Sequence, residues 1–512
     1  MPRGLLIFAL CLPLAILMGF MLADPMVESN RWVIGAALGS LLIPIILAIH
    51  QRALIWLTGA FITAFFLKGQ PQMWMVVAVL SFTIIVLSRP LRKVKIKPVW
   101  DKPTLFFLTL FIAAVLFTAM RTGGIGLRVL GSSIYGGRKY IALIASFIGF
   151  MALTFQALPR KHAQRDMTIW ALGPATSAIS SVAYWLGPNF YFLFLMFPVE
   201  LAMSQAIADY SPMVGMIKRY TGFSSACTAI CMFSLLRWGI KGMLQPSKPW
   251  RLGLLLFGFG LGMLSGFRSA ILIPMVTLSV QFFAEKLHKT RYAVGLAAFF
   301  GACVVFLAAF SESLPLAAQR AISFLPVRVD PIAAMDAKNS LSWRFDMWKV
   351  VVSDVLPNHL WFGKGYAIDP TDIYLAEESV KRGFQNDFEM SVRTGDYHSG
   401  PLSVLGPFGI VGTVPLILFL LSALRAMYRN YKQSEPDIQN INTVLFSYFV
   451  AQLIYFIFFF GGVETDLWIF ASTVGISLTV NGGLRQPVTE SKTKPVTQRG
   501  TLPDAGLSPA PA

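Results

Sequence analysis

Apolar runs of about 15 to 22 residues recur along almost the whole chain, and short polar segments separate them. A helix that crosses a lipid bilayer needs about 20 predominantly apolar residues, or somewhat fewer where the bilayer thins. A membrane β-barrel would instead show alternating polar and apolar positions in short segments. The pattern therefore predicts an all-α polytopic membrane protein with about 12 to 14 transmembrane helices.

Fourteen runs are predicted to span the membrane: residues 4–22, 32–49, 53–67, 72–88, 104–119, 140–158, 167–186, 222–236, 252–266, 269–284, 292–310, 402–424, 440–460 and 467–481. The further run 190–208 has the length of a span but contains Pro198 and Glu200. A charge in lipid is costly and proline interrupts a helix, so we expect a surface or re-entrant helix there. The first run resembles a signal peptide but lacks a cleavage pattern, so we expect a retained span.

One large polar segment interrupts the apolar pattern late in the chain. From Ser311 to Gly400 the sequence carries nine Lys/Arg, twelve Asp/Glu and two of the five histidines. We expect a partly helical loop outside the membrane that holds half of an active site. The predicted organisation is a multi-span membrane domain (1–310), the large catalytic loop (311–400), C-terminal membrane helices (401–481) and a disordered cytoplasmic tail (482–512).

The distribution of basic residues predicts the orientation of the helices, because cytoplasmic loops are enriched in Lys and Arg. The short segment 89–102 alone carries six of them. Both termini are then cytoplasmic and the loop 311–400 is periplasmic, with 25 of the 43 Lys/Arg inside and 18 of the 25 Asp/Glu outside. The net charge of +18 is spread over many inner loops, so it reflects topology and indicates no nucleic-acid partner.

Composition excludes a soluble protein, since the chain is 55% hydrophobic and only 13% charged, with a mean hydropathy of +0.63. The four cysteines, Cys11, Cys227, Cys231 and Cys303, all lie in apolar runs. No disulfide framework is therefore expected in the polar loop. Cys227 and Cys231 lie about one helical turn apart, where packing is the preferred interpretation and metal binding the alternative.

Two histidines, His359 and His398, fall on the predicted outer side. His398 comes directly before the span 402–424, at the membrane surface, and its near-neutral pKa suits a general base. The alternative is an interfacial histidine hydrogen-bonded to a loop carbonyl. His359 follows a predicted helix over 341–355 that Pro357 terminates, and we expect it to be structural.

Three arginines on the same side are candidates for anion binding. Arg268 lies in a turn between two short apolar runs, where a charge is costly unless it faces a polar cavity or an anion. Arg344 is placed in the first turn of the predicted helix 341–355, at the edge of an apolar stripe. Arg219 precedes the span 222–236 in a similar position. The planar guanidinium suits phosphate oxygens, whereas snorkelling or a surface ion pair is the alternative.

No metal or nucleotide site is predicted. The outer acids Glu377, Glu378, Asp387, Glu389 and Asp396 match no ion-binding loop pattern, so a solvated acidic face is preferred over Mg²⁺ binding. The patterns GxxxxGK[ST], GxSxG and HExxH do not occur in the sequence.

Several short segments on the outer side carry a resemblance to a known family. They are Arg219 to Gly222 (RYTG), Ser265 to Ser269 (SGFRS), Trp343 to Trp348 (WRFDMW), Gly363 to Gly365 (GKG), His398-Ser399, and Leu405 to Gly412 (LGPFGIVG). Their order, spacing and common side resemble the O-antigen ligase and polymerase membrane family over about residues 210 to 425. The family usually has Asn after the histidine, where this chain has Ser399.

The resemblance implies an inner-membrane enzyme of polysaccharide and lipopolysaccharide biosynthesis that works on the periplasmic side of a bacterium. It implies an inverting glycosyltransferase that moves a glycan from an undecaprenyl-diphosphate carrier to an acceptor hydroxyl, without a cofactor or metal. The implied catalytic residues are His398, Arg344 and Arg268. The substrate-binding candidates are Arg219, Lys364, Tyr397 and Trp348. Partners are the lipid-linked donor, a glycan, lipid or protein acceptor, and the bilayer.

Four functions stay open at this point. An O-antigen ligase that uses lipid A–core as acceptor is preferred over a polymerase or a protein O-oligosaccharyltransferase of the same fold. A transporter or flippase of polysaccharide precursors is the alternative outside enzymes. A transporter would place charges within its spans and often shows internal repeats, which this sequence lacks.

Overall fold

The computed structural model describes residues 47–485, apart from 68, 89–96, 128–129, 204, 207–216 and 384–387, together with residues 12, 15, 16 and 19. The two first predicted spans, most of the basic segment 89–102 and the tail beyond 485 therefore lie almost wholly outside the described residues. The described part is helical, and its β-structure is limited to two isolated bridges, Thr63 with Gln72 and Tyr135 with Ile368. The predicted all-α polytopic fold is confirmed.

Seven helices in the described part are long and apolar enough to cross a membrane, and three shorter apolar helices accompany them. The long ones are α4 (Lys102–Thr122), α5 (Gly137–Thr154), α9 (Thr221–Met243), α12 (Arg291–Phe310), α18 (Gly400–Lys432), α19 (Gln439–Phe458) and α20 (Val463–Asn481). The short ones are α3 (Met73–Ser88), α10 (Trp250–Leu264) and α11 (Ser269–Ala284). These ten helices coincide with ten of the predicted spans.

Two further predicted spans differ from the structure. The run 53–67 is not one helix, because the helix over residues 47–57 ends in a turn. The run 167–186 is divided into α6 (Arg160–Leu172), the 3₁₀ segment η2 (Gly173–Ser177) and α7 (Ala178–Leu186). Pro174 explains the break, since proline lacks the N–H that would continue the α-helical pattern.

The first part of the run 190–208 forms two short 3₁₀ segments. They are η3 (Pro188–Leu195) and η4 (Val199–Leu201), and Pro198 directly precedes the second one. Residues 203, 205 and 206 after them are α-helical, and 204, 207 and 208 lie outside the described residues. Many apolar side chains of the run are exposed, including Phe192 and Leu195. The described part of the run therefore forms no single regular span, and its placement on the surface or as a re-entrant segment stays a prediction.

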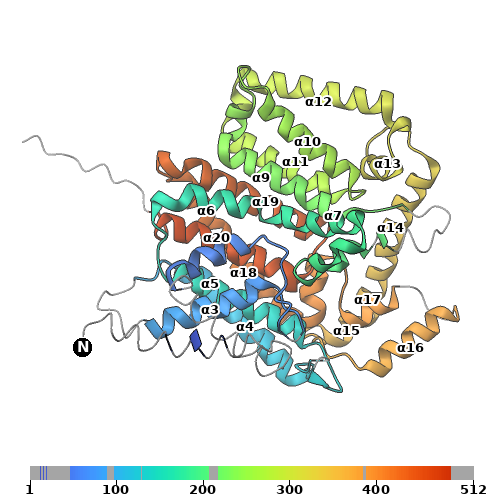
Figure 1. Cartoon of the computed structure of the whole chain (residues 1–512). Coiled ribbons are helices and arrows are strands. Elements are labelled where there is room, and N and C mark those ends of the chain that lie inside the picture. Colours follow the sequence, from blue (N-terminus) through green and yellow to red (C-terminus); the bar gives the residue numbers. More distant parts are fainter. Residues whose placement is uncertain are drawn as a thin grey trace, which may run out of the picture.

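The helices pack into one bundle in which neighbours in space are distant in sequence. Figure 1 shows α4 beside α18 and α5 beside α20, and α9 and α11 beside α19. Large buried side chains such as Phe111, Phe150 and Phe419 form the common core. Buried Cys227 and Cys231 are free and pack within α9, which agrees with the preferred interpretation. Helix α12 lies at the edge of the bundle with no buried residue (Figure 1).

Residues 311–400 form a layer of short helices at one end of the bundle (Figure 1). These elements are η6 (Ser311–Ser313), α13 (Leu316–Ile322), α14 (Pro331–Val350), η7 (Val351–Val355), α15 (Leu356–His359), α16 (Pro370–Lys381) and α17 (Glu389–Thr394). Other connections contain η5 (Leu287–Lys289) and η8 (Pro436–Ile438). Fully buried Met347, Val351 and Tyr397 give this layer its own apolar centre.

The helix predicted over 341–355 begins earlier than expected. Asp330 caps α14, because its carboxylate accepts a hydrogen bond from the Ile332 amide at 2.8 Å, and Pro331 occupies the first turn. Arg344 therefore lies in about the fourth turn of the helix and not in the first. Pro357 does not end the helical path, because it sits in the first turn of α15, where no N–H is required.

The buried face of α14 also differs from the predicted stripe of Phe345, Trp348, Val352 and Val355. Met347 and Val351 are fully buried, whereas Phe345 and Val352 are about half exposed. The five residues Val351–Val355 form a π-helical turn, which rotates the residues that follow relative to a regular α-helix.

Candidate active site

Three arginines from separate parts of the chain converge on one turn of α14. The Asp336 carboxylate accepts hydrogen bonds from Arg219 Nη2 at 3.2 Å and from Arg320 Nε. The backbone oxygen of Ala337 accepts a hydrogen bond from Arg268 Nη2 at 2.7 Å. Arg344 follows Ala337 by seven residues, about two helical turns, so it lies on the same face of α14.

The turn between α10 and α11 presents Arg268 to this face. Gly266 has a φ of +74°, which places it in the left-handed region that suits glycine and allows a tight reversal. The Gly266 oxygen accepts a hydrogen bond from Arg320 Nη1, and the Ser265 oxygen accepts one from the Tyr220 amide at 2.9 Å. These two hydrogen bonds connect the turn to Arg320 and to Tyr220. Because Tyr220 follows Arg219, they also hold the backbone next to Arg219 close to the backbone next to Arg268.

Burial and mutual repulsion act together on these arginines. Burial is the largest cause that lowers the pKa of Arg268, and the charges of Arg320 and Arg344 lower it further while Asp336 opposes them. Burial likewise lowers the pKa of Arg219 and of Arg344. Within the described residues, neither Arg268 nor Arg344 has a carboxylate in ion-pair contact, because Asp336 pairs with Arg219 and Arg320. Half-buried guanidinium groups that lack a counter-charge in the described part of the chain can bind an anion.

His398 sits between two aromatic rings directly before α18. Its ring centroid lies 5.0 Å from that of Phe460 and 5.5 Å from that of Trp343. The backbone φ of His398 is +50°, an uncommon value for a residue other than glycine and one often found at functional sites. The aromatic contacts hold the imidazole in place despite this strain.

Phe460 links the histidine to the arginine face. The Arg344 Cζ atom lies 5.5 Å from the Phe460 ring centroid, on which His398 also stacks at 5.0 Å. These distances limit the separation of Arg344 Cζ and the His398 ring centroid to their sum, about 10.5 Å. Tyr455 packs at 6.3 Å from Phe460 and is hydrogen-bonded to Ser269, the residue that follows Arg268. Arg344 and His398 thus share contact with Phe460, and the residue after Arg268 contacts the neighbouring Tyr455.

The surroundings of His398 favour its neutral form. Burial is the largest cause that lowers its pKa; Asp396 raises the pKa, and Arg344 and Lys139 lower it. Its Nδ1 atom is buried 3.7 Å from Asp396 Oδ1, with no hydrogen-bond partner in the part of the chain that is described. A neutral imidazole can accept a proton.

The three other predicted substrate-binding residues of the polar loop contact protein groups. They are Lys364, Tyr397 and Trp348. Lys364 Nζ donates to the backbone oxygens of Val392 at 2.6 Å and Arg393 at 3.2 Å, and burial lowers its pKa to about 8. Trp348 Nε1 donates to the Tyr397 oxygen at 2.8 Å. Tyr397 itself is fully buried. In this arrangement the three side chains support the backbone that carries the histidine.

Residues 252–417, about a third of the chain, match the model of the family described as O-Antigen ligase. No curated protein matches the chain. The matched segment contains Arg268, Arg320, Asp336, Arg344 and His398, whereas Arg219 precedes it.

Three residues of the candidate site were not predicted from the sequence. Arg320 is only 4% exposed and is the sole basic residue of the short helix α13, but no local pattern distinguishes it. Asp336 was one acid among many in the polar loop. Phe460 closes an apolar run before two glycines, which indicated only the end of a span. The role of each residue depends on a contact with a residue that is distant in the sequence. A single sequence does not reveal such a contact.

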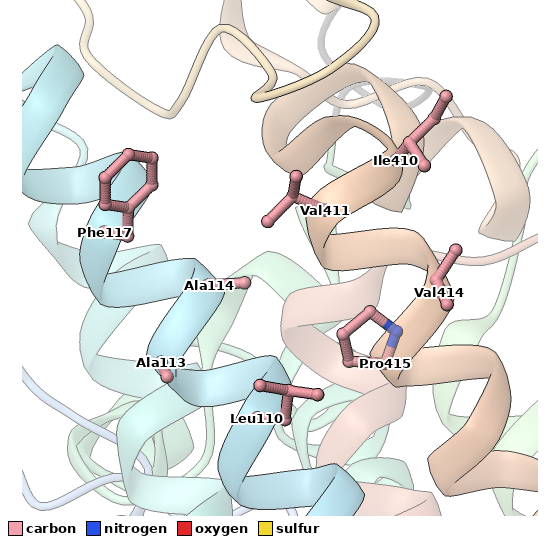
Figure 2. A pocket seen from close by; sticks show the side chains of 8 residues that line it. All are labelled: Leu110, Ala113, Ala114, Phe117, Ile410, Val411, Val414 and Pro415. Carbon is pink, nitrogen blue, oxygen red and sulfur yellow. The ribbon is translucent and has the colours of Figure 1, made fainter.

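A hollow of about 480 Å³ lies elsewhere, between α4 and α18. Figure 2 shows the apolar side chains that line it, among them Leu110, Phe117, Val411 and Pro415. None of its lining residues is ionisable, so it offers no group for acid–base chemistry or anion binding. The candidate active site is therefore the one formed by the arginines and His398.

Proposed function

We propose that the protein is an inverting glycosyltransferase that moves a glycan from an undecaprenyl-diphosphate carrier to an acceptor hydroxyl on the periplasmic side. The observation that carries this proposal is the pair of half-buried guanidinium groups, Arg268 and Arg344, which have no ion-paired carboxylate among the described residues and lie beside a histidine whose neutral form is favoured. A diphosphate supplies the missing negative charge, and a hydroxyl acceptor supplies the proton that His398 takes up.

In the proposed reaction the acceptor oxygen attacks the anomeric carbon of the first sugar. The bond between this carbon and the diphosphate oxygen breaks, and its electron pair remains on the diphosphate. The acceptor proton moves to the Nε2 atom of His398. Arg268 and Arg344 stabilise the charge that develops on the leaving oxygen. Attack opposite the leaving group inverts the anomeric configuration.

Among the acceptors we favour lipid A–core, which makes the protein a ligase. The family match with O-Antigen ligase supports this choice. A growing glycan or a protein hydroxyl would make it a polymerase or a protein glycosyltransferase instead. The guanidinium groups take the electrostatic role that a divalent cation has in many phosphate-dependent enzymes, so we also propose a metal-independent reaction.

Reconstitution of the purified full-length protein tests this function. We expect glycan transfer from an undecaprenyl-diphosphate donor to lipid A–core, at a rate that EDTA does not change, because no step requires a metal. Product formation is followed by gel mobility and mass spectrometry. Absence of transfer to lipid A–core, glycan or peptide acceptors would refute the proposal, and loss with EDTA that Mg²⁺ restores would refute its metal-free form.

The Asp396→Asn variant tests the protonation state of His398. The Asp396 carboxylate raises the pKa of His398, so its removal lowers that pKa. A general base is active above its pKa, and we therefore expect the acidic limb of the pH–rate profile to move to lower pH. The rate on the plateau near pH 8 stays within about twofold of wild type, because Asp396 changes the pKa of His398 and takes no part in the proposed reaction. An unmoved limb, or a limb moved to higher pH, contradicts the assignment of His398 as base.

A further inference from the structure

One carboxylate divides the four arginines of the site into two pairs. The four are Arg219, Arg268, Arg320 and Arg344, and the carboxylate is that of Asp336. Asp336 accepts hydrogen bonds from Arg219 and Arg320, whereas Arg268 binds only a backbone oxygen and Arg344 lies over the Phe460 ring. Within the described residues, neither Arg268 nor Arg344 forms an ion pair with a carboxylate. The carboxylate thus neutralises one of the four positive charges and holds two of the arginines, so that the guanidinium groups of Arg268 and Arg344 remain for a ligand.

The proposed reaction changes the charge of the diphosphate. The donor is a diphosphate esterified at both ends, with one negative charge on each phosphate. The product carries a free terminal phosphate, whose additional ionisation has a pKa near 6. The leaving lipid diphosphate therefore has close to one more negative charge than the donor at neutral pH. A site with four unopposed guanidinium groups would retain this product more tightly than it binds the donor.

We propose that Asp336 is a specificity-determining residue of the donor site, which matches the site to a doubly charged lipid diphosphate diester and promotes release of the diphosphate product. This inference rests on the proposed function of the same site. Asp336 acts by keeping Arg219 and Arg320 engaged with protein, so that Arg268 and Arg344 hold the diphosphate. Uniformly tighter anion binding would slow turnover, because product release would limit the rate.

Because Arg320 is buried, the proposed role of Asp336 can be distinguished from a purely structural role. Arg320 is 4% exposed, so removal of the Asp336 charge leaves a buried cation without its partner. Such a change destabilises the unliganded protein. A bound diphosphate then supplies the missing negative charge. Ligand binding should therefore stabilise an Asp336 variant more than it stabilises the wild type.

The Asp336→Asn variant of the full-length protein tests the inference, with farnesyl diphosphate as a soluble probe of the product. We expect a lower Tm without ligand, a larger upward Tm shift with the probe, and about tenfold tighter probe binding from the loss of one negative charge. Turnover is slower and product inhibition stronger. Asp346→Asn is the matched control, because Asp346 lies on the same helix in an exposed pair with Lys349, and its probe binding stays at the wild-type value.

Probe binding that is unchanged or weaker in Asp336→Asn, or a gain in Asp346→Asn of the same size, overturns the role of Asp336. If Asp336→Asn does not fold, Arg219→Gln decides the question, since its loss of probe affinity must be smaller than that of Arg344→Gln. An equal or larger loss overturns the inference. Wild-type protein that binds farnesyl diphosphate no better than farnesol would instead refute the proposed function itself.

Discussion

The His398→Asn variant is expected to lose glycan transfer by a factor of about 10² to 10⁴, the usual contribution of a positioned general base. Asparagine is the appropriate replacement, because it tolerates the left-handed backbone at φ +50° better than most residues but cannot take up the acceptor proton. The single-turnover rate with purified donor and acceptor measures the loss. Donor binding and Tm should remain close to wild type, since the diphosphate contacts lie on the arginines.

His359 provides the matched control for this experiment. It is the other histidine of the polar loop, lies in the short helix α15 and has no role in the proposed reaction. We expect His359→Asn to retain wild-type turnover. Wild-type turnover in His398→Asn, or an equal loss in both variants, would remove His398 from the mechanism.

The sequence predicts the membrane helices well because their signal is local. Bilayer thickness fixes the length of a span, and hydropathy alone places ten of the predicted spans on observed helices. The breaks in 53–67 and 167–186 were missed, because a sustained apolar run does not require a continuous helix. Pro174 was visible in the second run, but proline is tolerated in membrane helices often enough that it does not decide the outcome.

The start of α14 illustrates a signal that was present but not used. Asp330 followed by Pro331 is a typical helix start, with an N-cap acceptor and a proline in the first turn. The polar composition of the segment favoured a loop interpretation instead. The earlier start matters for the site, because it places Asp336, Ala337 and Arg344 on one rigid helix.

The candidate site could be predicted only in part. Arg268 and Arg344 attract attention because a charge near lipid requires an explanation, and His398 because few histidines reach the outer side. Arg320 and Asp336 give no such signal, since their meaning arises from an ion pair between two helices of the polar loop. Their recognition required the folded arrangement, and the functional roles of all five residues remain predictions that mutagenesis decides.

The Arg268→Gln and Arg344→Gln variants are each expected to lower kcat by about 10² to 10³, the effect of removing one preorganised group that stabilises developing negative charge. Glutamine keeps the length and polarity of the side chain but removes the charge. Arg328→Gln is the control, because Arg328 is an exposed arginine of the same loop. We expect this variant to retain the wild-type kcat. The double variant should lose less than the product of the single losses, since both groups act on one leaving diphosphate.

The two variants should differ in their pH dependence, which separates this role from a general loss of structure. The Arg344 charge is among the largest causes that lower the pKa of His398, whereas Arg268 is not among the largest causes. In Arg344→Gln the pKa of His398 therefore rises, and the acidic limb of the residual activity moves to higher pH, opposite to Asp396→Asn. In Arg268→Gln the limb stays in place while the plateau falls. A pH–rate profile of both variants checks this, and an identical profile in the two would mean that Arg344 and His398 do not share one site.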